Sequence, residues 1–344
     1  MQYKGMRQKT YDARRRLRNK NRNSQKEKNL DSFQEQFSSV IYVKASEAFS
    51  LARKTAYGET KINQDSYIIE KNVKGVLNFN IFGVLDWHGE EGHFVSRFVK
   101  RYIIHRIENH PSIKKLDEPQ EIYTELKSKN FSVISNIFVD ADSQIQKEKF
   151  DYVKSGTTIV LVIQLEQHII CANSGDSRAI AIYDEKDEDD LSKSKIFHLS
   201  YDCKPDLPNE KRRIIECGGE VEKAFYSDLK KDQYTPFRVW AKGKNYPGLA
   251  MSRSIGDMDA KKVGVIPNPQ IVEYTIDYST KYILICSDGI WEFMSNEEAM
   301  KIGNKYYLRN DPIGLCHQLT TSSVKLWEKN ECAIDDITVV VVFF

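Results

Sequence analysis

The sequence predicts a single α+β domain in which short strands alternate with amphipathic helices. Seven short runs are rich in Val, Ile, Phe or Tyr, as strands are, and four longer stretches have helical patterning. No segment recurs at a fixed period, which argues against a solenoid. The 344 residues could form one large domain or two ordinary ones, but no Pro-rich or Ser/Gly-rich linker follows residue 40. We therefore expect one domain spanning residues 41–344.

The predicted strands are runs whose side chains favour extended backbone. They are 66–69, 79–85, 159–165, 168–172, 178–183, 281–286 and 337–344. So many strands require at least two sheets or a barrel. The charged segment 184–190 lies between the strand 178–183 and a further strand-like run, 194–199. We expect this segment to be a solvated hairpin loop.

Helical signals occur in four stretches: 92–108, 118–149, 209–217 and 296–307. Ser295 can cap the last of these, and Glu297 and Glu298 suit its first turn, where acids are favourable. Gly218 and Gly219 follow the third stretch. Glycine reaches positive φ without steric cost, so this pair predicts a helix end and a turn.

Charge is balanced over the whole chain but not at its beginning. Lys and Arg total 51 against 49 Asp and Glu, so the net charge of +2 provides no chain-wide attraction to nucleic acid or acidic lipid. Residues 1–28, however, contain eleven Lys and Arg and only two acids. We interpret residues 1–40 as a basic, disordered tail. A docking arm for nucleic acid or an acidic partner is the alternative.

Three features predict a protein of the cytoplasm or nucleus. The longest apolar run, 337–344, is far short of the ~20 residues that span a bilayer, so no membrane insertion is expected. The six cysteines are scattered singly, without a C-x-x-C pair, which favours free thiols in a reducing compartment. The N-terminus lacks the apolar stretch of a signal peptide, and residue 2 is not the glycine of a myristoylation site.

Acidic residues recur where predicted strands begin or end. Asp86 follows the strand 79–85, with His88 two residues later and therefore on the same side of an extended chain. Asp288 follows the strand 281–286, and Asp335 precedes the strand 337–344. Carboxylates that converge repel one another unless protons or hard divalent cations neutralise them. Carboxylate-only sites suit Mg²⁺ or Mn²⁺ better than zinc, which prefers Cys and His.

A fourth acid, Asp65, precedes the strand 66–69, and with it the order of motifs resembles a known family. The chain is similar to the metal-dependent serine/threonine protein phosphatases of the 2C type, the PPM family, from about Ala56 to Phe344. The matching motifs are Asn63-Gln64-Asp65, Asp86-Trp87-His88-Gly89, Ser155-Gly156-Thr157-Thr158, Asn173-Ser174-Gly175-Asp176-Ser177-Arg178, Lys204-Pro205, Gly218-Gly219, Gly248-Leu249-Ala250-Met251-Ser252-Arg253-Ser254-Ile255-Gly256-Asp257, Ser287-Asp288-Gly289-Ile290-Trp291 and Asp335-Asp336-Ile337-Thr338.

The resemblance implies a four-layer α/β/β/α sandwich, two antiparallel β-sheets flanked by helices, with two Mg²⁺ or Mn²⁺ ions at one end. By position, Asp86 would bridge both ions, and Asp288 and Asp335 would complete the coordination of one. Trp87 would contribute its backbone carbonyl. Asp65 would hold metal-bound water, since outer-sphere carboxylates orient hydrated Mg²⁺.

The implied reaction is hydrolysis of phosphoserine and phosphothreonine monoesters by direct attack of a metal-bridging hydroxide, without a covalent intermediate. The leaving alkoxide is strongly basic, so a nearby acid must protonate it. His88 is the candidate, because an ordinary histidine pKa of ~6.5 leaves both protonation states accessible. Phosphoprotein substrates would be the partners. We expect a monomer, with no nucleic-acid binding beyond weak contact by the tail.

The chain departs from the family pattern at several site positions. Trp87 stands where glycine is common, and its indole could narrow the mouth of the site. The phosphate-contacting arginine of many members falls at Thr60, so Thr60 and its neighbour Lys61 are the candidate substrate-binding residues. Lys61 would supply the catalytic positive charge without the fork of a guanidinium. Gln64 replaces a glutamate beside the metals, which predicts weaker metal binding, and Asp336 adds a charge where asparagine is usual.

These departures leave an alternative open: a catalytically impaired pseudophosphatase that acts as a phosphoprotein-binding regulatory module. A second alternative is a nucleic-acid-binding protein that uses the basic tail. Four other charged residues in the matching motifs, Asp176, Arg178, Arg253 and Asp257, are interpreted as buried ion pairs or turn caps. They are not included among the catalytic candidates.

Overall fold

The computed structural model of the chain describes residues 43–52, 63, 65–186, 192–223, 235–330 and 333–344. The predicted basic tail, residues 1–40, lies outside these described residues, as do the candidate site residues Thr60, Lys61 and Gln64. In the described part of the chain, no helix is both long and apolar enough to cross a lipid bilayer. The cysteines in these ranges are free thiols.

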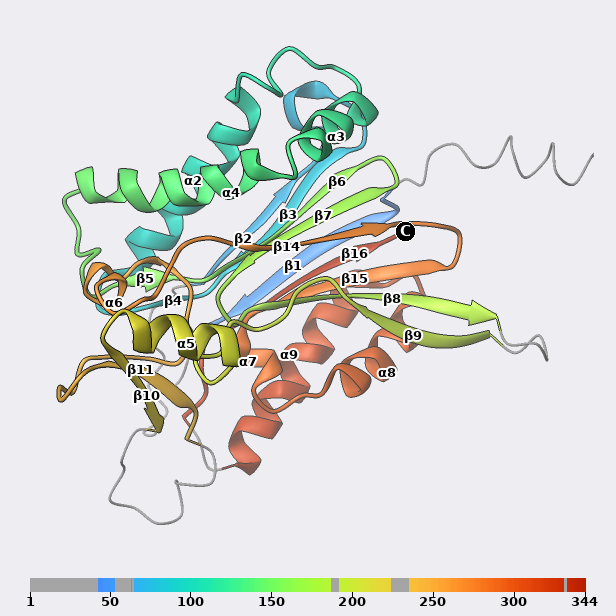
Figure 1. The fold of residues 1–344 in the computed structure, drawn as a ribbon. Coiled ribbons are helices and arrows are strands. Elements are labelled where there is room, and N and C mark those ends of the chain that lie inside the picture. The colour runs from blue at the N-terminus through green and yellow to red at the C-terminus, as the bar shows by residue number, and fades with distance from the viewer. Residues whose placement is uncertain (1–42, 53–62, 64, 187–191, 224–234, 331–332) are drawn as a thin grey trace, which may run out of the picture. The chain divides into compact units, whose positions relative to one another are not determined.

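Two five-stranded sheets form the centre of the fold (Figure 1). The first sheet has the order β1 (Ala45–Leu51), β16 (Ile337–Phe343), β15 (Thr280–Cys286), β8 (Arg178–Lys186) and β9 (Ser192–His198). The second has the order β14 (Gln270–Thr275), β7 (His168–Ser174), β6 (Ile159–Leu165), β3 (Phe79–Leu85) and β2 (Ser66–Glu70). Neighbouring strands run antiparallel throughout both sheets.

The central strands are covered on both faces, which explains their continuous apolar sequences. In β3, Phe79, Ile81 and Leu85 belong to the apolar core beneath the helices. Phe82 and Val84 alternate with them and are equally buried, so they face the other way. Strand β3 contacts β16 of the first sheet. The two sheets therefore pack face to face.

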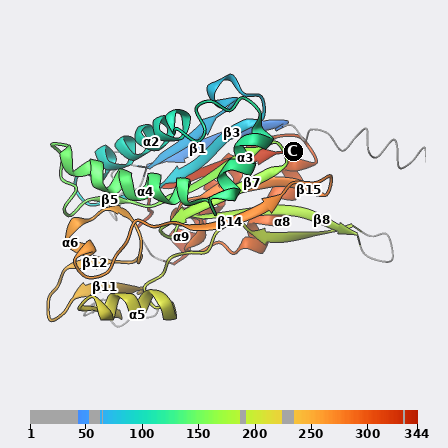
Figure 2. The ribbon, with the colours of Figure 1, turned by 45° about the horizontal axis from the view of Figure 1, so that its top comes forward.

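Helices cover both outer faces of this sandwich (Figures 1 and 2). Helices α2 (Gly92–Asn109), α3 (Pro119–Ser128) and α4 (Ser132–Gln144) share a core with the second sheet. Helices α8 (Asn296–Tyr307) and α9 (Pro312–Lys329) share a core with the first. Three short helices, η1 (Val73–Gly75), η2 (Ile145–Lys147) and α7 (Asp288–Trp291), occupy connections. The predicted α/β/β/α sandwich is confirmed.

A smaller unit, which we call the α5 subdomain, has its own apolar cluster. It contains α5 (Pro208–Glu216), α6 (Met258–Lys261) and a three-stranded sheet of β10 (Gly219–Lys223), β11 (Phe237–Ala241) and β12 (Pro247–Leu249). A second small sheet joins β13 (Ile255–Gly256), β5 (Gly156–Thr157) and β4 (Trp87–His88). Because β4 directly follows β3, this small sheet connects the α5 subdomain to the end of the sandwich.

Several predicted boundaries need correction. The predicted helix 118–149 is broken into α3, α4 and η2, because Asn130 and Phe131 adopt positive φ values of 49° and 54°. Part of the expected loop 184–190 is strand, since β8 continues to Lys186 in pairing with β9. Helix α9 was not predicted. The cap at Ser295 is confirmed: its hydroxyl accepts the Glu298 N–H at 3.2 Å, and the Glu298 carboxylate accepts the Ser295 N–H at 2.9 Å.

Candidate active site

Asp86 is held at the end of β3 by its backbone. Its carbonyl oxygen accepts the Thr158 N–H at 2.6 Å and the Thr157 hydroxyl at 3.0 Å, and its N–H donates to Thr158 Oγ1 at 3.1 Å. Thr158 Oγ1 in turn lies 2.8 Å from Ser177 Oγ. Two of the sequence motifs, around Thr157 and around Ser177, therefore fix the chain that carries Asp86.

Asp288 and Asp335 meet because β15 and β16 are neighbouring antiparallel strands. The Ser287 N–H donates to the Thr338 carbonyl at 3.0 Å, and the Thr338 N–H donates to Ser287 Oγ at 2.9 Å. Gly289 permits this close approach, since a Cβ atom there would lie 2.1 Å from the carbonyl oxygen of Asp336. Strand β16 also contacts β3. The three predicted acids thus converge at one end of the sandwich.

The four acids Asp65, Asp86, Asp288 and Asp335, here called the carboxylate cluster, interact strongly. Burial is the largest cause that raises the pKa of Asp86 well above its usual range, followed by the negative charges of Asp288, Asp65 and Asp335. Burial and the charges of Asp176 and Asp335 likewise raise the pKa of Asp288. Asp86 and Asp288 also lie within hydrogen-bonding reach of each other. The carboxylates of the cluster therefore repel one another at close range.

Asp65 lies directly before β2 and faces the same cluster. Burial, together with the charges of Asp336 and Asp335, raises its pKa to about 8, although the Thr338 and Ser287 hydroxyls lower it in part. Among the described residues, neither carboxylate oxygen of Asp65 has a hydrogen-bond partner within normal geometry. A buried acceptor without a donor is costly, and a cation or its bound water would satisfy it.

The donor chemistry of the carboxylate cluster fits hard divalent ions. Among the described residues, all candidate side-chain ligands are carboxylates, and the Asp65 oxygens without hydrogen-bond partners lie near other acids. In the described ranges, however, no three His, Cys, Asp or Glu side chains are already arranged as a metal site. The structure therefore brings the predicted acids together without showing a finished coordination geometry.

His88 is bound by Asp257, a residue that the sequence interpretation had left outside the site. His88 Nε2 lies 2.8 Å from Oδ1 and 2.7 Å from Oδ2 of Asp257. Burial, the largest influence, lowers the pKa of His88, but the charge and hydrogen bond of Asp257 and the charge of Asp176 outweigh it, so the pKa is raised. The only sequence signal for Asp257 was its motif, 248–257, because 169 residues separate it from His88.

Asp257 is itself a compensated buried acid. Burial raises its pKa, but His88, Lys261 and a 2.6 Å hydrogen bond from the Ser254 hydroxyl lower it to below the usual range. Gly156 makes room for this carboxylate, since a Cβ atom there would lie 2.0 Å from Asp257 Oδ2. Asp257 therefore remains ionised and anchors the His88 ring.

The indole of Trp87 packs against helix α2. It is 6% exposed, it fills the space over Gly92, and its ring meets His93 edge-on at 5.9 Å between centroids. A Cβ atom at Gly92 would lie 1.7 Å from the indole. The expected narrowing of the site mouth by Trp87 is therefore small, because the side chain is buried in a notch that Gly92 creates.

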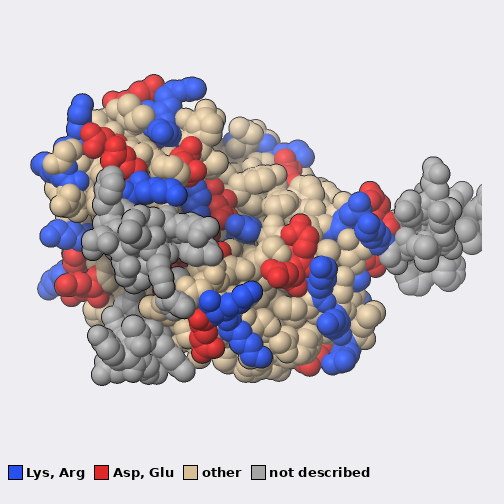
Figure 3. All heavy atoms as spheres, turned by 90° about the horizontal axis from the view of Figure 1, so that it is seen from below, with Lys and Arg blue, Asp and Glu red and all other residues tan. Residues whose placement is uncertain are grey.

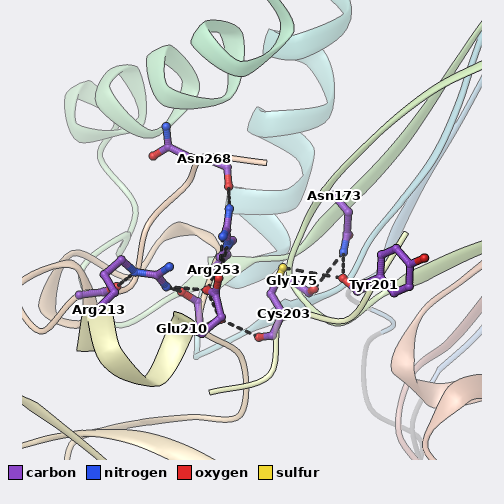
Figure 4. A network of polar contacts seen from close by, with 10 residues as sticks. Asn173, Gly175, Tyr201, Cys203, Glu210, Arg213, Arg253 and Asn268 are labelled. Atoms are coloured by element: carbon purple, nitrogen blue, oxygen red, sulfur yellow. Dashed lines mark hydrogen bonds and ion pairs between the residues drawn. The ribbon is translucent and has the colours of Figure 1, made fainter. Parts of the chain in front are cut away.

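The charged residues that we interpreted as structural are found in ion pairs. Asp176, 1% exposed, pairs with Lys204 at 2.6 Å, and Arg178 pairs with Asp202 at 2.7 Å. Arg253 pairs with Glu210 at 2.6 Å, within the polar network of Figure 4.

Glu210 also accepts hydrogen bonds from Arg213 at 2.7 Å and from the Ser252 hydroxyl at 2.6 Å. Arg253 donates further to the Asn268 carbonyl at 2.8 Å. This network, here called the Glu210 network, ties α5 to the segment that leads to Asp257.

Comparison with known proteins gives a consistent picture at the level of sequence. A family model described as protein phosphatase 2C matches residues 58–321. An Arabidopsis thaliana protein named probable protein phosphatase 2C 35 is 30% identical over 294 residues, which cover 82% of this chain and 78% of the relative. A rice protein named probable protein phosphatase 2C 48 is 28% identical, and the match covers 89% of this chain and 87% of that protein.

A solved structure shares the fold. The crystal structure of a serine-threonine phosphatase 2C from Toxoplasma gondii superposes with a TM-score of 0.69 at 21% identity, and it covers 89% of this chain and 97% of the other.

Proposed function

The chain belongs to the protein phosphatase 2C family, and from this premise we propose that it hydrolyses phosphoserine and phosphothreonine monoesters with bound Mg²⁺ or Mn²⁺. The observation that carries the proposal is the carboxylate cluster, in which acids from separate strand ends raise one another's pKa. Such a cluster is costly for folding and is retained where a cation binds.

We assign the metal-binding role to Asp86, Asp288 and Asp335, with the Trp87 carbonyl as a further ligand and Asp65 as a partner of metal-bound water. When bound, the ions would make a nucleophile available from water at neutral pH and would offset the negative charge of the phosphate. The number of ions, two, is inferred from the family resemblance.

His88 would protonate the leaving alkoxide. Its Nε2 is occupied by Asp257, so in the imidazolium form Nδ1 carries the proton that can be transferred. Asp257 is a positioning residue, because it holds the ring and favours the protonated form. Lys61 and Thr60 would contact the substrate phosphate, on the basis of the sequence alone.

The enzyme is favoured over the phosphoprotein-binding module because the acids that the reaction requires are all present.

The surface charge bears on the nucleic-acid alternative. On the face drawn in Figure 3, lysine and arginine side chains are interspersed with acids. The described residues on this face therefore do not form a patch of one sign that would attract nucleic acid. We also propose a monomer of the cytoplasm or nucleus that acts on phosphoproteins.

The test is phosphate release from phosphothreonine peptides with and without Mn²⁺. We expect release that depends on Mn²⁺, and a decrease of at least ~1,000-fold in kcat/KM for Asp288→Asn, because a metal ligand is lost. Equal thermal melting of the two proteins without metal would show that the variant folds. A wild type no faster than Asp288→Asn would overturn the proposal.

A further inference from the structure

A cavity of about 360 Å³ lies between the α5 subdomain and the loop before β5. Its apolar lining comes from Tyr246, Pro247, Leu249 and Ala260 of the α5 subdomain and from Val153 of the loop. The charged residues Lys154, Asp257 and Asp259 complete the lining. The volume is near the lower end of the ~300–1,000 Å³ range of ligand pockets, which suits one large side chain rather than a nucleotide or a flavin.

The cavity is bordered by the residue that binds His88. Asp257 lines the cavity and lies 2.7 Å from His88 Nε2. The cavity and the candidate leaving-group site are therefore separated by a single side chain. Consecutive Cα atoms are ~3.8 Å apart, so a residue close in sequence to a bound phosphoresidue can reach the cavity.

The walls of the cavity are fixed by backbone hydrogen bonds. The Asp257 N–H donates to the Ser155 carbonyl at 3.1 Å, and the Asp259 N–H donates to the Val153 carbonyl at 3.2 Å. On the other side, the Ala241 N–H donates to the Tyr246 carbonyl at 2.7 Å. A preformed cavity binds with little ordering cost.

The chemistry of the lining selects the occupant. Tyr246 and Val153 are exposed apolar side chains at the rim, and the carboxylate of Asp259 is already paired with Lys262 at 2.8 Å. Burying an aromatic or long aliphatic side chain here would remove apolar surface from water on both partners. Lys154 and Asp257 also line the cavity with opposite charges, so the charge of the lining favours neither an acidic nor a basic occupant.

We propose that this cavity binds a large apolar side chain of the substrate, one to three residues from the phosphoserine or phosphothreonine, and so gives the phosphatase its sequence preference. The inference rests on the proposed function, since it takes the phosphoresidue to lie beside His88. It adds a substrate class: phosphoproteins in which an aromatic or aliphatic residue flanks the phosphorylated one.

The test uses phosphothreonine peptides of Gly and Ser in which one Phe is moved through the positions from three before to three after the phosphoresidue. We expect one position, or two adjacent positions, to raise kcat/KM by about five- to tenfold over the peptide without Phe, from the apolar surface buried. A wild type with less than about twofold preference at every position would overturn the inference.

Val153→Trp fills the cavity from its rim, where Val153 is 36% exposed, so the change need not disturb the core. This variant should reduce the Phe preference to below about twofold. Ile215→Trp adds the same side chain to the outer face of α5, where Ile215 is 53% exposed and outside the cavity, and should keep the preference. Retention of the full preference in Val153→Trp would contradict the inference.

A second measurement does not depend on catalysis. Fluorescence anisotropy with the dephosphorylated Phe and Gly peptides should show about five-fold tighter binding of the Phe peptide to wild type, and no difference with Val153→Trp. If no peptide is hydrolysed but this binding difference is found, the proposed function fails while the cavity assignment stands. Equal binding of both peptides would overturn the assignment.

Discussion

Two buried acidic regions of this protein have opposite electrostatics. In the carboxylate cluster, burial and neighbouring acids raise the pKa of Asp65 to about 8 and that of Asp288 well above its usual range. Burial also acts on Glu210, which is 3% exposed, but hydrogen bonds from Arg253, Arg213 and Ser252 lower its pKa to about 2. Burial raises the carboxylate pKa in both regions, and the neighbouring charges decide the direction of the net shift.

The comparison separates two uses of a buried carboxylate. Glu210 is neutralised by the chain's own guanidinium groups, so its charge serves to join α5 to the neighbouring segment. In the carboxylate cluster, by contrast, neighbouring acids raise the pKa of Asp288, and Lys204, which pairs with Asp176 at 2.6 Å, offsets this only in part. A bound external cation can therefore stabilise the carboxylate cluster. It would not stabilise the Glu210 network, because guanidinium groups already neutralise that carboxylate.

The largest expected effect on stability is that of Glu210→Gln. Removing one partner of a buried ion pair leaves the other charge uncompensated, so the free energy of unfolding should fall by roughly 3–5 kcal/mol. Urea denaturation would measure it. Glu216→Gln, on the exposed side of the same helix, should change stability by less than about 0.5 kcal/mol. Equal effects of the two substitutions would contradict the comparison.

Low pH should abolish the contribution of Glu210 to the free energy of unfolding. Its folded pKa of about 2 lies below its ordinary value of 4.5, so the ionised group stabilises the fold above pH 4.5. This stabilisation is lost as the pH falls from 4.5 to about 2, and it corresponds to roughly 3 kcal/mol. Urea denaturation across that range should show a steeper loss for wild type than for Glu210→Gln. Parallel curves would contradict the low pKa.

Addition of a divalent metal ion should stabilise the folded protein through the carboxylate cluster. At a Mn²⁺ concentration of about 100 times its Kd, the free energy of unfolding should rise by about 2.7 kcal/mol, because the ion binds only the folded state. Thermal melting with Mn²⁺ or with a chelator would measure this. The increase should vanish in Asp288→Asn and persist in Glu210→Gln. A stabilisation that survives Asp288→Asn would place the ion elsewhere.

The smallest effect concerns Asp257, a compensated acid inside the site. Asp257→Asn removes the charge that anchors His88, and kcat/KM for a phosphothreonine peptide should fall about 10- to 100-fold. An aryl phosphate, whose leaving group needs less protonation, should be affected several-fold less. Equal losses on both substrates would indicate a structural role only.

Much of the fold followed from local pattern. Strands β3 and β6 have the predicted bounds, because an apolar run with β-branched residues is a local signal. The acids at strand ends were also predicted from local sequence, because the position of an acid relative to its strand decides at which end of the sheet it lies. The break between α3 and α4 was missed. Asn130, a residue type enriched in the left-handed conformation, was its only local signal, because Phe131 rarely adopts that conformation.

The sequence alone established which residues stand at strand ends, because alternation and β-propensity act between near neighbours in the chain. Whether a buried acid is repelled or paired was decided only in three dimensions. His88 and Asp257 are 169 residues apart, and Glu210 and Arg253 are 43 apart, so neither pair has a local signature. Desolvation and charge depend on distance in space, and packing of the sheets sets those distances.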